Sequence, residues 1–97
     1  MDERAKAVPT VRIDNGRVKA TEWAFAPGAE TGWHRHGHDY VVVPLTDGEL
    51  LIEQSGETSG TARLSRGIPY ARSVGVEHNV VNVGDEPLSF LEIEITS

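Results

Sequence analysis

The sequence contains no cysteine and few basic residues. The first absence excludes a disulfide framework and any metal site built from thiolates. Lys and Arg total 9 against 15 Asp and Glu, and the basic residues are scattered along the chain. Because no basic stripe is present to follow a phosphate backbone, we expect no nucleic-acid partner.

Long apolar segments are also missing. The longest apolar run, Val41 to Leu45, is far too short to span a bilayer. The first ten residues, MDERAKAVPT, mix charged residues with alanine and lack the apolar centre of a signal peptide. We therefore expect no membrane partner and a cytoplasmic location.

What the sequence does contain is a series of short β-like segments separated by turn residues. The predicted strands are 10–14, 17–25, 39–45, 49–54, 57–64, 78–83 and 88–96. Asn15-Gly16 is a strong hairpin signal between the first two, and no segment shows a sustained helical period. The sequence predicts an all-β fold, closed or sandwiched, as a single domain over residues 9–97. We expect residues 1–8 to be a poorly ordered segment.

The last predicted strand, LSFLEIEIT, alternates regularly. Leu91, Ile93 and Ile95 share one face, and Glu92 and Glu94 share the other. We predict that the apolar face is buried and that the two glutamates face water, as in many antiparallel sheets.

Three of the four histidines lie in the stretch GWHRHGHDY. On a strand, His34 and His36 point to the same side, about 6.6 Å apart, so two imidazoles can approach one ion. His78 is the one histidine outside this stretch and can supply a third ligand. His38 lies about 13 Å from His34 on a straight strand, and would reach the ion only if Gly37 bends the chain. The predicted metal ligands are therefore His34, His36 and His78, with His38 in reserve.

Two segments resemble the two conserved motifs of the cupin superfamily. The first motif is matched by Gly28, His34, His36 and Gly48. The second is matched by Gly67, Gly75, His78 and Asn82, with Ser73 where the motif usually has proline. The chain most resembles compact single-domain cupins, some of which are named for β-alanine degradation. The resemblance implies a jelly-roll β-barrel or sandwich of the RmlC-like type and a homodimer. It also implies a divalent metal ion (Fe, Mn, Ni or Zn) held by the motif histidines.

The sequence departs from the first motif at its glutamate ligand. The two positions where the motif places that glutamate hold Tyr40 and Val41. Tyr40 shares the histidine face and can line a cavity, but its pKa near 10 means that it coordinates a metal only if activated. Asp39 is the nearest carboxylate and points to the opposite face unless a bulge turns it inward. Three neutral imidazoles leave the double charge of the ion intact, which favours an anionic ligand.

These observations leave two classes of function open. The first is a metal-dependent enzyme of the dioxygenase, isomerase or decarboxylase type, acting on a small acidic molecule. In that case Tyr40 and His38 are the polar candidates for catalytic residues. The alternative is a non-catalytic sensor or carrier that binds a small molecule, with or without metal. Fold resemblance does not choose between them.

Overall fold

The computed structural model describes residues 4–54 and 59–97, and every regular element in these ranges is a β-strand. The strands are β1 (Val8–Asp14), β2 (Val18–Phe25), β3 (His34–Arg35), β4 (Tyr40–Pro44), β5 (Gly48–Gln54), β6 (Gly60–Leu64), β7 (Tyr70–Arg72), β8 (Glu77–Asn82) and β9 (Leu88–Ile95). The predicted all-β fold is confirmed. Residues 57 and 58 of one predicted strand lie outside the described ranges. Within the described ranges, no helix is long and apolar enough to cross a membrane.

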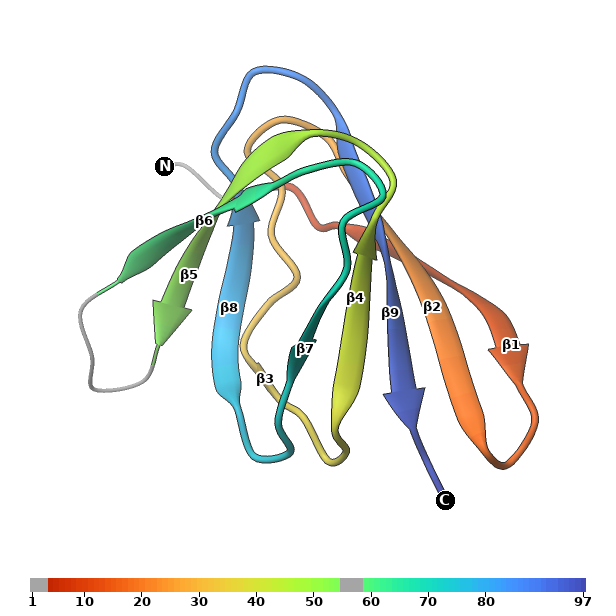
Figure 1. Cartoon of the computed structure of the whole chain (residues 1–97). Helices are drawn as coiled ribbons and strands as arrows, with labels where there is room; N and C mark the ends of the chain where they lie inside the picture. The colour runs from red at the N-terminus through yellow and green to blue at the C-terminus, as the bar shows by residue number, and fades with distance from the viewer. Residues whose placement is uncertain (1–3, 55–58) are drawn as a thin grey trace.

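The strands form two antiparallel sheets that pack face to face (Figure 1). The larger sheet has the order β1-β2-β9-β4-β7, and the smaller one has the order β3-β8-β5-β6. Neighbours in each sheet come from distant parts of the chain: β9 lies between β2 and β4, and β8 lies between β3 and β5. This crossing connectivity is that of a jelly roll.

The core fills the space between the sheets and reaches one end of the sandwich. Phe25 and Phe90 meet there with ring centroids 5.4 Å apart. Leu50 from the opposite sheet is also fully buried. A buried side chain of this size contributes about 1.5–3 kcal/mol of transfer free energy. Toward the other end the gap between the sheets is lined by polar side chains as well as apolar ones.

The face assignment predicted for the last strand is wrong. Leu88 and Phe90 are the buried residues of β9, so Glu92, two positions further, also faces the sandwich interior. Leu91 is paired with Val43 and lies on the outer face. The alternation was identified correctly, but Leu91, Ile93 and Ile95 lie on the outer face, while the two glutamates share the inner face with Leu88 and Phe90. Regular alternation does not say which face is covered.

The N-terminal residues contact the body of the domain from Arg4 onward. Ala7 is buried, and its N–H donates to the carbonyl of Glu30 over 2.8 Å. Val8 already begins β1. Residues 1–3 lie outside the described ranges, and the predicted domain boundary at residue 9 stays a prediction.

Candidate metal centre

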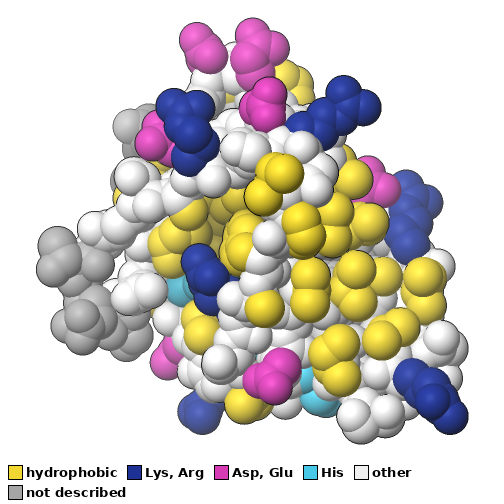
Figure 2. Space-filling view, viewed as in Figure 1, with side chains coloured by type: hydrophobic (Ala, Val, Ile, Leu, Met, Phe, Trp, Pro, Cys, Tyr) yellow, Lys and Arg dark blue, Asp and Glu magenta, His cyan; other side chains and the backbone are white. Residues whose placement is uncertain are grey.

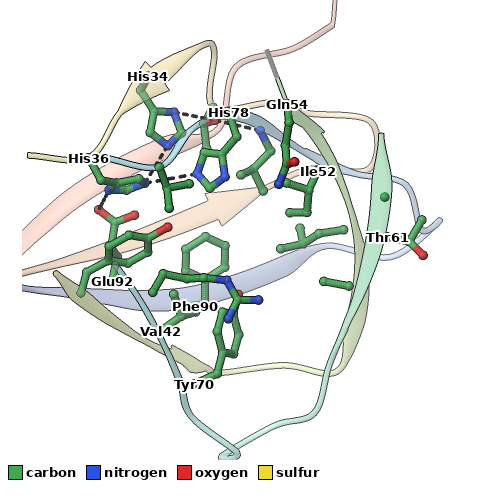
Figure 3. A pocket seen from close by; sticks show the side chains of 18 residues that line it. His34, His36, Val42, Ile52, Gln54, Thr61, Tyr70, His78, Phe90 and Glu92 are labelled. Carbon is green, nitrogen blue, oxygen red and sulfur yellow. Dashed lines mark hydrogen bonds and ion pairs between the residues drawn. The ribbon is translucent and has the colours of Figure 1, made fainter. Parts of the chain in front are cut away.

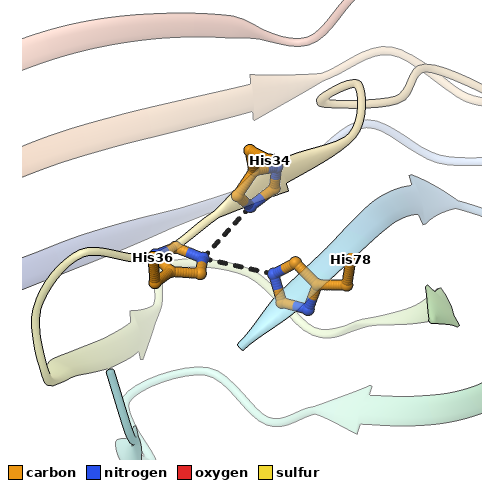
Figure 4. A group of neighbouring side chains, drawn as sticks. All are labelled: His34, His36 and His78. Carbon is orange, nitrogen blue, oxygen red and sulfur yellow. Dashed lines mark hydrogen bonds between the residues drawn. The ribbon is translucent and has the colours of Figure 1, made fainter. Parts of the chain in front are cut away.

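Three imidazoles meet in the gap between the two sheets (Figure 4). The Nε2 atoms of His34 and His36 are 3.1 Å apart, and those of His36 and His78 are 3.2 Å apart. One ligand atom from each of the three residues lies within 4.8 Å of the others. The structure thus brings together the three histidines that the sequence analysis selected.

The spacing of these nitrogens suits a single ion. With metal–nitrogen bonds of about 2.0–2.1 Å, two ligand nitrogens would be about 2.9 Å apart at a right angle and about 3.4 Å apart at a tetrahedral angle. The two measured separations fall between these limits. The cluster could therefore hold a metal, because neither backbone nor side chain would have to move far.

Pairing between β3 and β8 places two of the ligands. His34 is directly opposite His78 in this antiparallel pair, so both side chains leave the sheet on the same side. His36 follows the end of β3, and its backbone is held by two bonds to the loop before β8. Its N–H donates to Val76 over 2.9 Å, and its carbonyl accepts from Gly75 over 2.8 Å.

The second ring nitrogen of His34 has a backbone partner. His34 Nδ1 lies 2.8 Å from the carbonyl oxygen of Gly32, which can only accept, so Nδ1 carries the proton. The lone pair of Nε2 is then free and points into the cluster. A histidine that ligates a metal usually has its other nitrogen held in this way.

Burial keeps two of the imidazoles neutral. Desolvation, with His34 nearby, lowers the pKa of His36 to about 4. Desolvation, followed by the neighbouring His34, His36 and Arg72, lowers the pKa of His78 to about 4. Both rings are therefore in the form that binds a metal at neutral pH.

Tyr40 lies against the cluster but is not suited to be a ligand. Its ring stacks on His36 with centroids 3.9 Å apart and an angle of 21°. Burial, followed by the negative charge of Glu92, raises the pKa of the Tyr40 hydroxyl above its ordinary value. The phenol therefore stays protonated, and it packs against His36 and lines the cavity.

Glu92 is the site residue that the sequence analysis missed. It extends from β9 toward His36, with its Oε2 4.0 Å from His36 Nδ1 (Figure 3). Desolvation raises the pKa of Glu92 to about 7, with a contribution from Glu94 that Lys19 partly offsets. A carboxyl group thus stands beside the cluster, although it comes from the far end of the chain and not from the first motif.

The two remaining candidates lie away from the cluster. His38 is 45% exposed, and its Nδ1 is 3.9 Å from Glu94 Oε2. Asp39 is exposed and accepts a bond from the backbone N–H of Val74 over 2.8 Å. Neither residue lines the cavity beside the histidines. The predicted catalytic roles of Tyr40 and His38 stay predictions.

A cavity of about 310 Å³ adjoins the cluster. Figure 3 shows the three histidines at one end of it, with Val42 and Phe90 along one wall and Ile52 on the other side. Arg72 also lines it, with its guanidinium carbon 4.6 Å from the centre of the Tyr70 ring. The cavity is large enough for a small organic molecule and offers it a cationic group, a carboxyl group and apolar walls.

Known proteins resemble this chain in sequence and in structure. A family model described as "Cupin domain" matches residues 21–94. "Beta-alanine degradation protein BauB" of Pseudomonas aeruginosa is 59% identical over 95 residues, which cover 98% of this chain and 99% of that protein. The crystal structure of a cupin domain from Bordetella pertussis is 58% identical, covers 100% of both chains and has a TM-score of 0.96. An RmlC-like cupin with a double-stranded β-helix fold from Methanocaldococcus jannaschii is 11% identical and has a TM-score of 0.78. That match covers 99% of this chain and 85% of the other, and it shows the fold alone.

Proposed function

The chain belongs to the cupin family, and from that premise we propose that it holds one divalent metal ion on His34, His36 and His78 and acts on a small acidic molecule bound beside it. The observation that carries this proposal is the convergence of the Nε2 atoms of the three imidazoles, with separations of 3.1 and 3.2 Å. Fe, Mn, Ni and Zn all accept imidazole ligands, so the donor set does not select among them.

The ligand set favours an anionic molecule in the cavity. A divalent ion held by three neutral imidazoles keeps its full charge, and when bound it can act as a Lewis acid or, if it is redox-active, as an electron-transfer centre. Arg72 adds a second positive group to the lining. A guanidinium binds a carboxylate with two parallel hydrogen bonds, so Arg72 is suited to receive and orient one. The name of the Pseudomonas relative supports a small carboxylic acid as the class of ligand.

The remaining residues of the cavity would set how the molecule lies. The apolar walls formed by Val42, Ile52 and Phe90 exclude water from the part of the ligand that carries no charge. Glu92 brings a carboxyl group to within 4.0 Å of His36 Nδ1, on the side of the ring that faces away from the cluster. With these roles the site would serve a dioxygenase, isomerase or decarboxylase type of reaction.

A binding protein without turnover is the second candidate. The observation that favours it is Tyr40, which stands at a position where the first cupin motif places a glutamate and whose raised pKa keeps its hydroxyl protonated. A sensor or carrier needs the cavity and Arg72, with or without the ion, and does not need a group that transfers protons.

Metal content in three proteins tests the proposal. We would purify the chain without a histidine tag, together with His78→Ala and the matched control His38→Ala, and measure metals by mass spectrometry. We expect one ion per chain in the wild type and in His38→Ala, because His38 lies outside the cluster, and loss of the ion in His78→Ala. A wild-type protein that stays metal-free after reconstitution would contradict the proposal.

A reaction assay on the metal-loaded protein then separates the two candidates. A panel of short carboxylic acids would be incubated with and without O₂, and products would be identified by mass spectrometry. Product formation that Arg72→Ala reduces would support an enzyme. Acids that bind in calorimetry, bind more weakly to Arg72→Ala and yield no product would support a binding protein.

We also propose that the protein is a homodimer joined through the outer face of the larger sheet. Leu91 and Ile93 on β9 lie opposite Val43 and Val41 on β4, on the face that points away from the core. Yellow side chains gather over the right half of Figure 2, the area that β9, β2 and β1 occupy in Figure 1. A large exposed apolar patch is typical of an interaction surface.

Sedimentation of two variants tests the dimer. Ile93→Lys places a charge in the middle of the patch and is expected to give monomers. Val83→Lys is the control, because Val83 is exposed and follows β8 in the smaller sheet. A monomeric wild type would contradict the proposal. The cytoplasmic location and the absence of a nucleic-acid or membrane partner stay predictions.

A further inference from the structure

We infer that a clamp formed by Arg4, Glu30, Glu53 and Asn79 sets the orientation of the His34 ring, an inference whose consequence for metal binding rests on the function proposed above. These four residues come from the N-terminal segment, the loop before β3, β5 and β8. They lie outside the cavity lining and outside the histidine cluster. They are joined by the hydrogen bonds described below.

The loop that leads into β3 is held on both sides by backbone hydrogen bonds. On one side Glu30 pairs with the N-terminal segment: its N–H donates to Ala5 over 2.9 Å, and its carbonyl accepts from Ala7 over 2.8 Å. On the other side the N–H of Thr31 donates to Val80 of β8 over 2.9 Å. The N-terminal segment is thus one of the two supports of this loop.

Asn79 occupies the centre of the clamp and is 2% exposed. Its Nδ2 donates to Glu30 Oε1 and to Glu53 Oε1, both over 2.8 Å. Its Oδ1 accepts from the backbone N–H of Gly32 over 2.9 Å. Because both carboxylates can only accept, they fix which end of the amide faces them, and therefore which end faces Gly32.

Arg4 stabilises this arrangement of two carboxylates. Glu30 and Glu53 bond the same amide nitrogen, so their negative charges lie close together. Arg4 Nη1 donates to Glu30 Oε1 over 3.2 Å and to Glu53 Oε1 over 3.1 Å. Lys6 adds a contact of 3.1 Å to the other oxygen of Glu30. Without Arg4 the two carboxylates would repel each other across Asn79.

Gly32 connects the clamp to His34. Its N–H is held by Asn79, and its carbonyl accepts from His34 Nδ1 over 2.8 Å. Gly32 has a φ of 92°, in the left-handed region that a glycine adopts without strain. The N–H and the carbonyl of Gly32 belong to the successive peptides on either side of its Cα, so a shift of the Gly32 backbone would move the acceptor that holds the Nδ1 proton and would turn Nε2 away from His36. Arg4 and Asn79 are positioning residues for His34 in this sense.

Two readouts on Arg4→Ala test the inference. The first uses the metal-free protein and follows the ¹⁵N shifts of the His34 ring and the hydrogen exchange of the Gly32 amide. We expect a mixture of ring tautomers and at least tenfold faster exchange in Arg4→Ala. The second is the affinity for Co²⁺, measured by calorimetry and by its visible spectrum, which should fall about tenfold or more, as is usual when a group supporting a ligand is lost.

A matched pair of charges elsewhere on the surface provides the control. Arg12 pairs with Glu22 over 3.0 Å between β1 and β2, its side chain is 56% exposed against 39% for Arg4, and no hydrogen bond within the described residues links this pair to the histidines. Arg12→Ala should leave both readouts unchanged. Arg4→Lys, which keeps the charge, should restore most of the tautomer preference.

The outcomes separate the clamp from the metal. Unchanged His34 shifts and Gly32 exchange in Arg4→Ala would overturn the inference, whatever the Co²⁺ affinity does. Equal effects of Arg4→Ala and Arg12→Ala would overturn it as well, because they would indicate a general loss of stability. If the wild type binds no Co²⁺ but Arg4→Ala alters the His34 ring, the metal proposal fails and the clamp is supported.

Discussion

Replacing Glu92 by glutamine should stabilise the metal-free protein at alkaline pH. Burial raises the pKa of this carboxyl from its ordinary value of 4.5 to about 7, and its side chain is 13% exposed. Above pH 7 the folded chain must hold a buried charge that the unfolded chain carries in water. At about 1.4 kcal/mol for each pKa unit, the penalty reaches about 3 kcal/mol.

The sign of the pH dependence follows from the same values. Between pH 4.5 and 7 the folded chain binds a proton at Glu92 that the unfolded chain has lost, so this group lowers stability as the pH rises through that window. Below pH 4.5 the carboxyl is neutral in both states, and Glu92→Gln should change little. For a domain of this size, about 3 kcal/mol corresponds to a rise in Tm of the order of 10 °C.

The assay is urea unfolding of wild type and variant in the presence of a chelator at pH 4.5, 6, 7 and 8. The pKa shifts of His36 and His78 are caused mainly by burial, which both proteins share, so the difference between the two curves reports chiefly on Glu92. Glu49→Gln is the control, because Glu49 is exposed on β5 and should show no such trend. A difference between Glu92→Gln and wild type that is the same at pH 4.5 and pH 8 would refute the reasoning.

Three further predictions concern the scaffold. Gly48→Ala should lower the free energy of unfolding by about 1–3 kcal/mol, because the added Cβ would overlap Cδ1 of the buried Leu88. Thermal melts followed by circular dichroism would show the loss, and an unchanged Tm would mean that the Leu88 side chain moves aside freely. Leu50→Ala should cost about 2–5 kcal/mol by opening a cavity between the sheets, and a loss below 1 kcal/mol in urea unfolding would contradict the packing described. Hydrogen bonds from Asn79 and Lys6 lower the pKa of Glu30 to about 2, so its stabilising contribution is complete above pH 4.5 and is lost as the pH falls toward 2. Glu30→Gln should therefore remove part of the acid sensitivity of unfolding between pH 4.5 and 2, and an identical profile would show that the clamp does not depend on the charge.

The strands and the histidine cluster were predictable because their signals are local or periodic. The Asn15-Gly16 pair predicted a hairpin, and in the structure Asn15 Oδ1 accepts the backbone N–H groups of Arg17 and Val18, both over 3.0 Å. The H-x-H spacing placed His34 and His36 on one side. His78 could be added because the chain offers no other histidine apart from His38.

The carboxyl group beside the cluster was not predictable in the same way. The alternation of β9 is equally regular read from either face, and hydrophobicity alone favoured the wrong face for Glu92. Only the pairing with β4, in which Glu92 lies opposite Val42, shows that it points inward. The clamp of Arg4, Glu30, Glu53 and Asn79 could not be predicted from local patterns either, because its hydrogen bonds join four segments through side chains that are 26 to 49 residues apart.

The position of β9 also governs when the domain can fold. This strand is the last of the nine, yet it supplies the partners of both β2 and β4, so Phe25 must wait for Leu88 before it can pair. Domains whose contacts join residues far apart in the sequence fold slowly, in about milliseconds to seconds. On the ribosome, β2 would emerge long before β9, its neighbour on the side away from β1, and the edges of β2 and β4 that β9 covers would remain unpaired. We therefore expect the larger sheet to close only after β9 has left the exit tunnel, so that the strands made before it stay incompletely paired until then.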